Sequence, residues 1–231
     1  MKVLVACEES QWVCTEFRHA GCEAYSADVQ KPSGGHPGWH ILGDVLPYIN
    51  GNCTFKTMDG VEHKISCTWD LLIAHPPCTY LTNAGARWFD EKKYGENASK
   101  RKLLRQSAYR FFMDIAEAEC DRIAIENPIG YMNSHYRKPD QIIQPYFFGD
   151  PEYKTTCLWL KGVPCLKPTK MLENPLKKYP TYISKKGYTK HVGFVLRHPN
   201  DSVTRSKTFP GIARAMAEQW GKENPRTGGN Q

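Results

Sequence analysis

The residue best placed for covalent chemistry is a cysteine that directly follows two prolines. Cys78 ends the sequence His-Pro-Pro-Cys, which comes after the apolar segment 69–74. Because proline fixes its backbone angle φ, Pro76 and Pro77 hold the thiol in a rigid turn, and fixed placement accounts for much of a catalytic rate. We interpret Cys78 as a nucleophile. The alternative is a structural loop cysteine, since most of the nine cysteines are expected to be small core residues.

An acidic residue and an amide follow a second apolar segment. Glu126 and Asn127 come directly after the predicted strand 122–125. Burying a glutamate at the end of a strand is costly unless its carboxyl is paired or protonated. A protonated carboxyl can donate a hydrogen bond to an unprotonated ring nitrogen of a nucleobase. We therefore interpret Glu126 as the partner of Cys78 on a base; the alternative is a Glu-Asn pair that caps the following turn.

These two positions belong to a regular alternation of strands and helices. We predict strands over residues 2–6, 23–27, 69–74, 122–125 and 153–160, helices over 11–20, 99–119 and 211–221, and a hairpin over 51–66. Such alternation predicts a doubly wound α/β sheet with right-handed crossovers, in which ligands bind beyond the carboxyl ends of the strands. We expect four side chains at that rim, namely Glu8, Asp28, Cys78 and Glu126.

Composition narrows the class of protein. The 231 residues suffice for one domain with a substantial core, and no apolar run approaches the ~20 residues that cross a membrane. The opening MKVLVACEES is typical of a buried first strand and not of a secretory signal. Nine cysteines without a CxxC pair match no common zinc pattern, so we predict a reduced, cytoplasmic protein without a metal.

The positive charge is concentrated in one segment. Residues 161–207 hold eleven Lys or Arg and two acidic residues, a net charge of +9 against +7 for the whole chain. Tyrosines and a phenylalanine are interspersed with these cations. Basic side chains suit contact with phosphates, and aromatic rings suit stacking on bases, so this segment predicts nucleic-acid binding. The alternative is a solvated, lysine-rich surface.

The two motifs together resemble those of the DNA cytosine-5 methyltransferases. The Pro-Pro-Cys nucleophile loop of that family matches residues 76–78, and its Glu-Asn-Val motif appears as Glu126-Asn127-Pro128. Residues 3–28 resemble the family's cofactor-binding opening, and Gly211-Ile212-Ala213 lies in what looks like the helix that closes the cofactor pocket. The resemblance covers most of 1–160 and 205–221. Within the family, the chain is most similar to compact phage and prophage members.

The resemblance implies a Rossmann-like, class I S-adenosylmethionine-dependent methyltransferase fold and methyl transfer to C5 of cytosine in DNA. It implies that Cys78 adds to C6 while Glu126, supported by Asn127, holds N3. The implied cofactor is S-adenosylmethionine, with Asp28 on the ribose hydroxyls and Asp44 on adenine. The implied cofactor-binding residues are Ala6, Cys7, Glu8, Ser10, Asp28, Asp44 and Pro76. The implied substrate-binding residues are Pro77, Thr79, Arg87, Lys154, Thr155, Lys177, Lys178, Lys185 and Lys186.

The sequence departs from the family pattern in four places. Glu8-Glu9-Ser10-Gln11 replaces the Gly-rich first turn, and Thr79 follows Cys78 where glutamine is usual. Lys154-Thr155-Thr156 stands where Gln-x-Arg is usual, and the segment that would recognise the target is short. We divide the chain into a core (1–160), a reduced recognition region (161–207), a returning helix (208–221) and a tail (222–231), which we expect to be disordered. A short recognition region predicts few contacts with the bases.

Three other functions stay open at this point. The same chemistry could act on RNA or on a free cytidine nucleotide, which a short recognition region also suits. A non-catalytic phage protein that binds nucleic acid or a nucleotide would fit the altered first turn. A Cys-His hydrolase is the weakest alternative, because none of the eight histidines stands in a recognisable partner motif. The sequence predicts no oligomeric state.

Overall fold

The computed structural model describes residues 1–175, 179–192, 194–198 and 201–222. Its centre is a seven-stranded sheet in the order β3-β2-β1-β6-β7-β9-β8. Among these strands only β9 runs against the others, since its pairings with β7 and β8 are antiparallel and the remaining pairings are parallel. The strands are β1 (Lys2–Ala6), β2 (Glu23–Asp28), β3 (His40–Leu42), β6 (Leu71–Ala74), β7 (Ile123–Asn127), β8 (Gln141–Ile143) and β9 (Thr156–Lys161).

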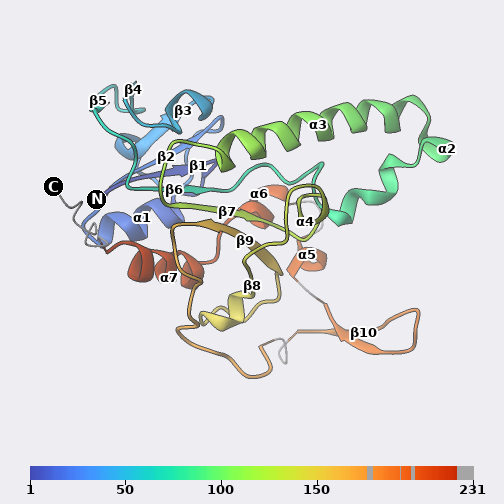
Figure 1. The fold of residues 1–231 in the computed structure, drawn as a ribbon. Helices are drawn as coiled ribbons and strands as arrows, with labels where there is room; N and C mark the ends of the chain where they lie inside the picture. Colours follow the sequence, from blue (N-terminus) through green and yellow to red (C-terminus); the bar gives the residue numbers. More distant parts are fainter. Residues whose placement is uncertain (176–178, 193, 199–200, 223–231) are drawn as a thin grey trace.

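Helices cover both faces of this sheet (Figure 1). The long helix α3 (Glu96–Ala116) lies over one face, while α1 (Trp12–His19) and α7 (Pro210–Trp220) lie side by side over the other. The side chains of β1 alternate between the two, as the two-residue period of a strand requires. Leu4 packs in the cluster that contains Phe112 of α3, and Val5 packs in the cluster of the α1–α7 face. Both faces of the central strands are therefore buried.

The predicted doubly wound, mostly parallel α/β sheet is confirmed. The reversal of strand order between β1 and β6, with antiparallel β9 inserted before β8, is consistent with the Rossmann-like fold of class I methyltransferases. Two boundaries differ from the sequence prediction. Strand β7 continues through Glu126 and Asn127 because both residues pair with β9. Helix α3 begins at Glu96, directly after Gly95, whose φ of 50° interrupts the preceding short helix.

Smaller elements decorate the sheet. The predicted hairpin is present as β4 (Cys53–Lys56) and β5 (Glu62–Ile65). The 3₁₀ helix η3 (Asn83–Phe89) and the short helix α2 (Glu91–Tyr94) lead into α3, and α4 (Met132–His135) follows β7. The basic segment forms a second hairpin, β10 (Thr181–Ile183) with β11 (Thr189–His191), which projects away from the sheet (Figure 1). Two short helices, α5 (Phe194–Arg197) and α6 (Ser202–Ser206), precede α7.

Three further observations concern the described residues. None of their helices combines the length and the apolar character needed to span a membrane. No group of three or more His, Cys, Asp or Glu among them could hold a metal ion. All nine cysteines are free thiols. The predicted tail lies almost wholly outside the described residues, which end at residue 222.

Candidate active site

The parallel register brings the carboxyl ends of four strands to one level. Ala6 of β1 pairs with Ala27 of β2 and with Ala74 of β6, and Ala74 pairs with Ile125 of β7. The residues that directly follow these four register partners are Cys7, Asp28, His75 and Glu126. Three of these four are acids or thiols, and the fourth is a histidine. The site is built on this rim.

Cys78 lies at the start of a tight turn beyond β6. Its carbonyl oxygen accepts hydrogen bonds from the backbone N–H groups of Leu81 and Thr82, both at 2.9 Å. Two arginines of α3 hold the same turn from outside, as Arg105 donates to the carbonyl of Tyr80 (3.0 Å) and Arg101 to that of Thr79 (3.5 Å). The thiol is half-buried in a loop that is fixed at both ends.

Glu126 is buried at the end of β7 and has three polar neighbours. The Nδ1 atom of His75 lies 3.4 Å from Oε2 of Glu126, and both side chains are largely buried. Thr156 of β9 and the charge of Lys154 also act on the carboxylate. Burial raises the pKa of Glu126, but the contacts with His75, Lys154 and Thr156 outweigh burial, so the net pKa is lowered. Glu126 is thus ionised at neutral pH.

The charge of the Glu126 carboxylate acts on the Cys78 thiol. Burial raises the pKa of Cys78, and the negative charge of Glu126 raises it further. Lys154 and Arg205 lower it, but not enough to offset the first two effects. Lys154 therefore acts on both groups. In the free protein the pair consists mainly of a neutral thiol and a charged carboxylate.

The loops that follow β6 and β7 are joined to each other. Asn127 donates from Nδ2 to the carbonyl of Pro76 at 2.8 Å, and Tyr131 donates its N–H to the carbonyl of Leu81 at 2.7 Å. An isolated antiparallel bridge links Thr82 to Gly130. A Cβ atom on Gly130 would lie 1.9 Å from the carbonyl oxygen of Leu81, so only glycine fits there. These contacts fix the position of the thiol relative to the carboxylate.

Gly130→Ala is expected to displace the turn that begins at Cys78, because the new methyl group meets backbone and not a flexible side chain. We expect a loss of about 1–3 kcal/mol in the free energy of unfolding, as for other overpacked sites. We also expect slower alkylation of Cys78 by a substrate-like probe. Gly85→Ala is the matched control, since its Cβ would meet the tip of Arg101 at 3.3 Å and no backbone atom closer than 3.5 Å. Equal stability of the two variants, measured by urea unfolding, would contradict this reading.

The first turn keeps the backbone shape of a Gly-rich loop without its glycines. Cys7 and Gln11 both adopt a φ of 59°, the left-handed region that normally favours glycine. The Gln11 side chain is fully buried and donates to the carbonyl of His36 at 2.9 Å. Gly34 packs against this turn, since a Cβ there would lie 2.7 Å from the carbonyl oxygen of Ser10. Buried side-chain contacts thus maintain a turn that other sequences make with glycine.

Glu8 caps helix α1 from within the chain. Its two carboxylate oxygens accept the N–H groups of Val13 (2.6 Å) and Cys14 (3.1 Å), and the residue is 3% exposed. Burial raises the pKa of Glu8 to about 7, although the charge of His75 and these two N–H groups lower it. The resemblance implies a cofactor contact for Glu8, but the structure commits both oxygens to the helix N-terminus. Ser10 and Ala6 are likewise buried in the turn.

The remaining residues implied for the cofactor form an acidic pair on the same rim. Burial raises the pKa of Cys7, and the charges of Asp28 and Asp44 raise it further, which places both carboxylates around Cys7. Asp28 is half-buried and Asp44 is exposed. One carboxylate oxygen of Asp28 accepts the backbone N–H of Gln30, and one carboxylate oxygen of Asp44 accepts that of Leu46. Their other oxygens suit the hydroxyl and amino donors of a nucleoside, so the donor set fits S-adenosylmethionine.

The residues implied for the substrate lie in different parts of the structure. Lys154 lies beside Cys78 and Glu126, while Thr155 is exposed and accepts a hydrogen bond from Gln144. Thr79 and Arg87 are exposed, and the guanidinium of Arg87 lies over the ring of Trp88. The cations whose charges act on the thiol are Lys154 and Arg205. Pro77 is exposed and Pro76 buried. Lys185 and Lys186 are exposed at the tip of the β10–β11 hairpin, and Lys177 and Lys178 lie outside the described residues.

A buried ion pair attaches the basic segment to the core. Arg197 of α5 pairs with Glu152, and its guanidinium lies 3.5 Å from the ring centroid of Tyr179. Tyr179 donates its hydroxyl to the same carboxylate at 2.8 Å. At the end of the basic segment, Nζ of Lys154 donates a hydrogen bond to the backbone carbonyl of Lys207 at 3.2 Å. The basic segment is therefore connected to the cation that adjoins the thiol.

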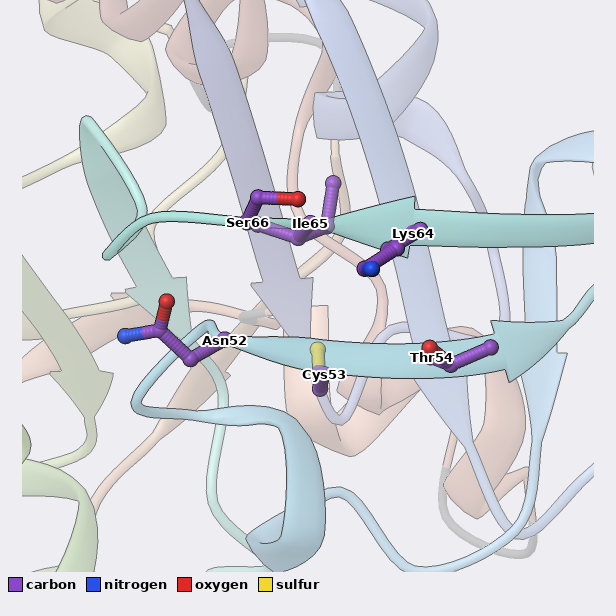
Figure 2. A pocket seen from close by; sticks show the side chains of 6 residues that line it. All are labelled: Asn52, Cys53, Thr54, Lys64, Ile65 and Ser66. Atoms are coloured by element: carbon purple, nitrogen blue, oxygen red, sulfur yellow. The ribbon is translucent and has the colours of Figure 1, made fainter.

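A surface hollow of about 250 Å³ lies elsewhere, on the β4–β5 hairpin. Figure 2 shows its lining by six hairpin side chains, among them Cys53 and Lys64. None of the candidate site residues lines it. We therefore base the site on the rim residues and not on this hollow.

Four residues of the site were missed by sequence reasoning. They are His75, Gly130, Thr156 and Arg205. His75 stands in the nucleophile motif itself, three residues before Cys78, and its place directly after a strand was the only available signal. Thr156 belongs to the stretch that stands in place of the Gln-x-Arg motif, whereas Gly130 and Arg205 lie in segments without a motif; only the fold brings the three to the rim.

No protein-family model and no curated protein matches the sequence. Among solved structures, the chain is similar to a candidate DNA modification methyltransferase encoded within a prophage of E. coli, with a TM-score of 0.45 and 14% identity. The match covers 74% of this chain and 51% of that protein, so the chain spans about half of its length. The fold assignment therefore depends on the strand order described above.

Proposed function

We propose that the protein transfers a methyl group from S-adenosylmethionine to C5 of cytosine in DNA, with Cys78 as the nucleophile. The observation that carries this proposal is geometric: Glu126 lies at the end of β7, the neighbour of β6, and the hydrogen bond from Asn127 to the carbonyl of Pro76 holds the Cys78 loop against it. A thiol that can bond to C6 and a carboxyl that can serve N3 are the two groups that this reaction needs on one pyrimidine ring. Covalent addition divides a difficult substitution into easier steps.

The protonation states of the two groups indicate the order of proton movements. Cys78 carries a proton that it must lose, and Glu126 lacks the proton that N3 must gain. In the proposed first step the proton passes from the thiol through Glu126 to N3, while the sulfur bonds to C6. The electron pair of the C5–C6 double bond then becomes available at C5. When bound, S-adenosylmethionine supplies the electrophilic methyl group.

The final step restores the protein. A base removes the proton from C5, the bond between sulfur and C6 breaks, and N3 returns its proton to Glu126 and from there to Cys78. In a duplex the cytosine must first leave the base stack. Lys154, which acts on both groups, favours the thiolate while the sulfur is charged. Asp28 and Asp44 would hold the nucleoside part of the cofactor.

Covalent trapping tests this proposal. With 5-fluorocytosine in DNA the final step cannot remove fluorine, so the protein stays attached to the base. We expect an adduct that requires S-adenosylmethionine and that maps to the peptide containing Cys78. A tritium-transfer assay on duplex DNA, single-stranded DNA, RNA and dCMP then identifies the substrate. Absence of both the adduct and tritium transfer on all four would reject the function.

The β10–β11 hairpin is expected to contact the phosphate backbone. Its exposed Lys185 and Lys186 flank the turn that projects from the sheet. Changing both to glutamate should weaken DNA binding and reduce the slope of log K against log salt by about two, since each lost phosphate contact contributes roughly 0.9. The same changes at Lys56 and Lys64, which are exposed on the β4–β5 hairpin, serve as the control. An equal effect of both pairs on the slope, measured by fluorescence anisotropy, would remove the hairpin from the binding surface.

A further inference from the structure

The imidazole of His75 is placed against Glu126 by the sheet itself. Ala74 of β6 and Ile125 of β7 are register partners, so the next residues of the two strands, His75 and Glu126, lie side by side. The His75 side chain is 7% exposed and that of Glu126 is 15% exposed. Nδ1 of the ring lies 3.4 Å from Oε2 of the carboxylate. The backbone N–H of His75 donates to the carbonyl of Ala6 at 2.9 Å, which fixes the residue from the other side.

Within the described part of the chain, the ring makes one hydrogen-bonding contact, which is the contact of Nδ1 with Glu126. The other ring nitrogen, Nε2, is buried and has no hydrogen-bond partner among the described residues. Because the ring is buried, it cannot turn freely to another partner. A ring used only for packing would not need a nitrogen aimed at a carboxylate. The arrangement favours a specific task for Nδ1.

Building on the function proposed above, we propose that His75 is a positioning residue, whose Nδ1–H donates to Oε2 of Glu126 and holds the carboxyl in the orientation that serves N3 of cytosine. A buried carboxylate with a fixed donor loses less orientational freedom when the base arrives. Fixed placement of such a group accounts for a large part of catalysis. His75 acts through Glu126 and needs no contact with the base.

Several charged or titratable groups surround the pair and must be considered with it. Glu126 faces Lys154, Thr156 and Cys157 from the β9 side, and Cys78 from the loop after β6. His75 faces Glu8 from the loop after β1. The hydrogen bond from His75 is the largest of the effects that lower the pKa of Glu126 against its burial. Without it, burial should raise that pKa.

Two amide substitutions separate a donor at Nδ1 from one at Nε2. In His75→Asn the amide nitrogen takes the place of Nδ1 and can still donate to Glu126, whereas in His75→Gln it takes the place of Nε2 and cannot. We expect His75→Gln to lower kcat about 10- to 100-fold, the effect of losing a hydrogen bond to a charged group. We expect His75→Asn to stay within about threefold of the wild type. The KM for S-adenosylmethionine should remain unchanged in both.

A second readout uses the free protein and does not depend on the proposed reaction. Carbon-13 NMR of labelled glutamate carboxyls, with the Glu126 signal assigned from Glu126→Gln, reports its pKa. This pKa should lie below the ordinary value in the wild type, rise in His75→Gln and return downward in His75→Asn. His63→Gln, on the β4–β5 hairpin, is the control for loss of a partly buried histidine.

The outcomes distinguish the two proposals. An unchanged Glu126 pKa in His75→Gln, or a kcat of His75→Asn as low as that of His75→Gln, would overturn the role of His75. A wild type that methylates no cytosine, together with the expected NMR shifts, would reject the function but support the coupling of His75 with Glu126. Thermal unfolding of all three variants shows whether either amide alters the fold.

Discussion

Cys78→Ser is expected to remove methyl transfer and adduct formation while leaving the affinity for S-adenosylmethionine nearly unchanged. A serine hydroxyl gives up its proton far less readily than a thiol, and its oxygen is a much weaker nucleophile toward C6. We expect a rate loss of roughly 10⁴-fold or more, as for other catalytic nucleophiles. Asp28 and Asp44, which would hold the nucleoside part of the cofactor, belong to β2 and to the loop after β3 and not to the loop that holds the thiol. Tritium transfer measures the first effect, and isothermal calorimetry the second.

The exposed cysteine at position 165 supplies the control. Cys165 is a free thiol, and its contact with the described residues is a long one from sulfur to the carbonyl of Asp140 (4.0 Å). Cys165→Ser should therefore keep wild-type activity and wild-type trapping by 5-fluorocytosine. If Cys78→Ser also methylates DNA at the wild-type rate, Cys78 is not the nucleophile, and the remaining rim thiol, Cys7, becomes the next candidate.

Much of the fold could be predicted from the sequence because the local signals agree with one another. Apolar runs of four to six residues gave the central strands, and polar residues directly after them marked the rim. The missing detail concerns pairings between distant segments. β9 extends β7 by two residues, so Glu126 and Asn127 belong to a strand and not to a loop. No local pattern encodes that register, since it depends on where residues 156–161 return to the sheet.

The residues of the site also divide into those that local sequence signals identify and those that only pairings between distant segments bring together. Cys78 and Glu126 could be named because motif and strand end coincide, but the residues that tune them are less visible. The charge of Arg205, on α6, acts on the thiol, and Gly130, in the loop after β7, lies against the carbonyl of Leu81. Conversely, Glu8 stands at a strand end and looks like a ligand residue, yet its carboxylate caps α1. Position at the rim therefore identifies candidates, and the hydrogen-bond partners decide which of them stay free for a ligand.

Glu126→Gln is expected to change two properties of the protein in opposite directions. Methyl transfer should fall by at least about 10²-fold, because glutamine cannot relay a proton to N3. The pKa of Cys78 should fall as well, since the charge of Glu126 is one of the two effects that raise it, and the other, burial, remains. At a pH below that pKa, a larger fraction of Cys78 is then thiolate, so iodoacetamide should modify it faster than in the wild type.

Slower methyl transfer combined with faster alkylation of Cys78 alone would not be expected from a general loss of structure in the site. A disordered site would lose methyl transfer and would also expose buried thiols such as Cys14 and Cys157 to alkylation, which peptide mapping detects. Glu117→Gln, at the exposed end of α3, should change neither property. If Cys78 in Glu126→Gln reacts more slowly or at the same rate, the carboxylate does not act on the thiol. The proposed passage of a proton between the two groups would then lose its basis, because it requires each to respond to the charge of the other.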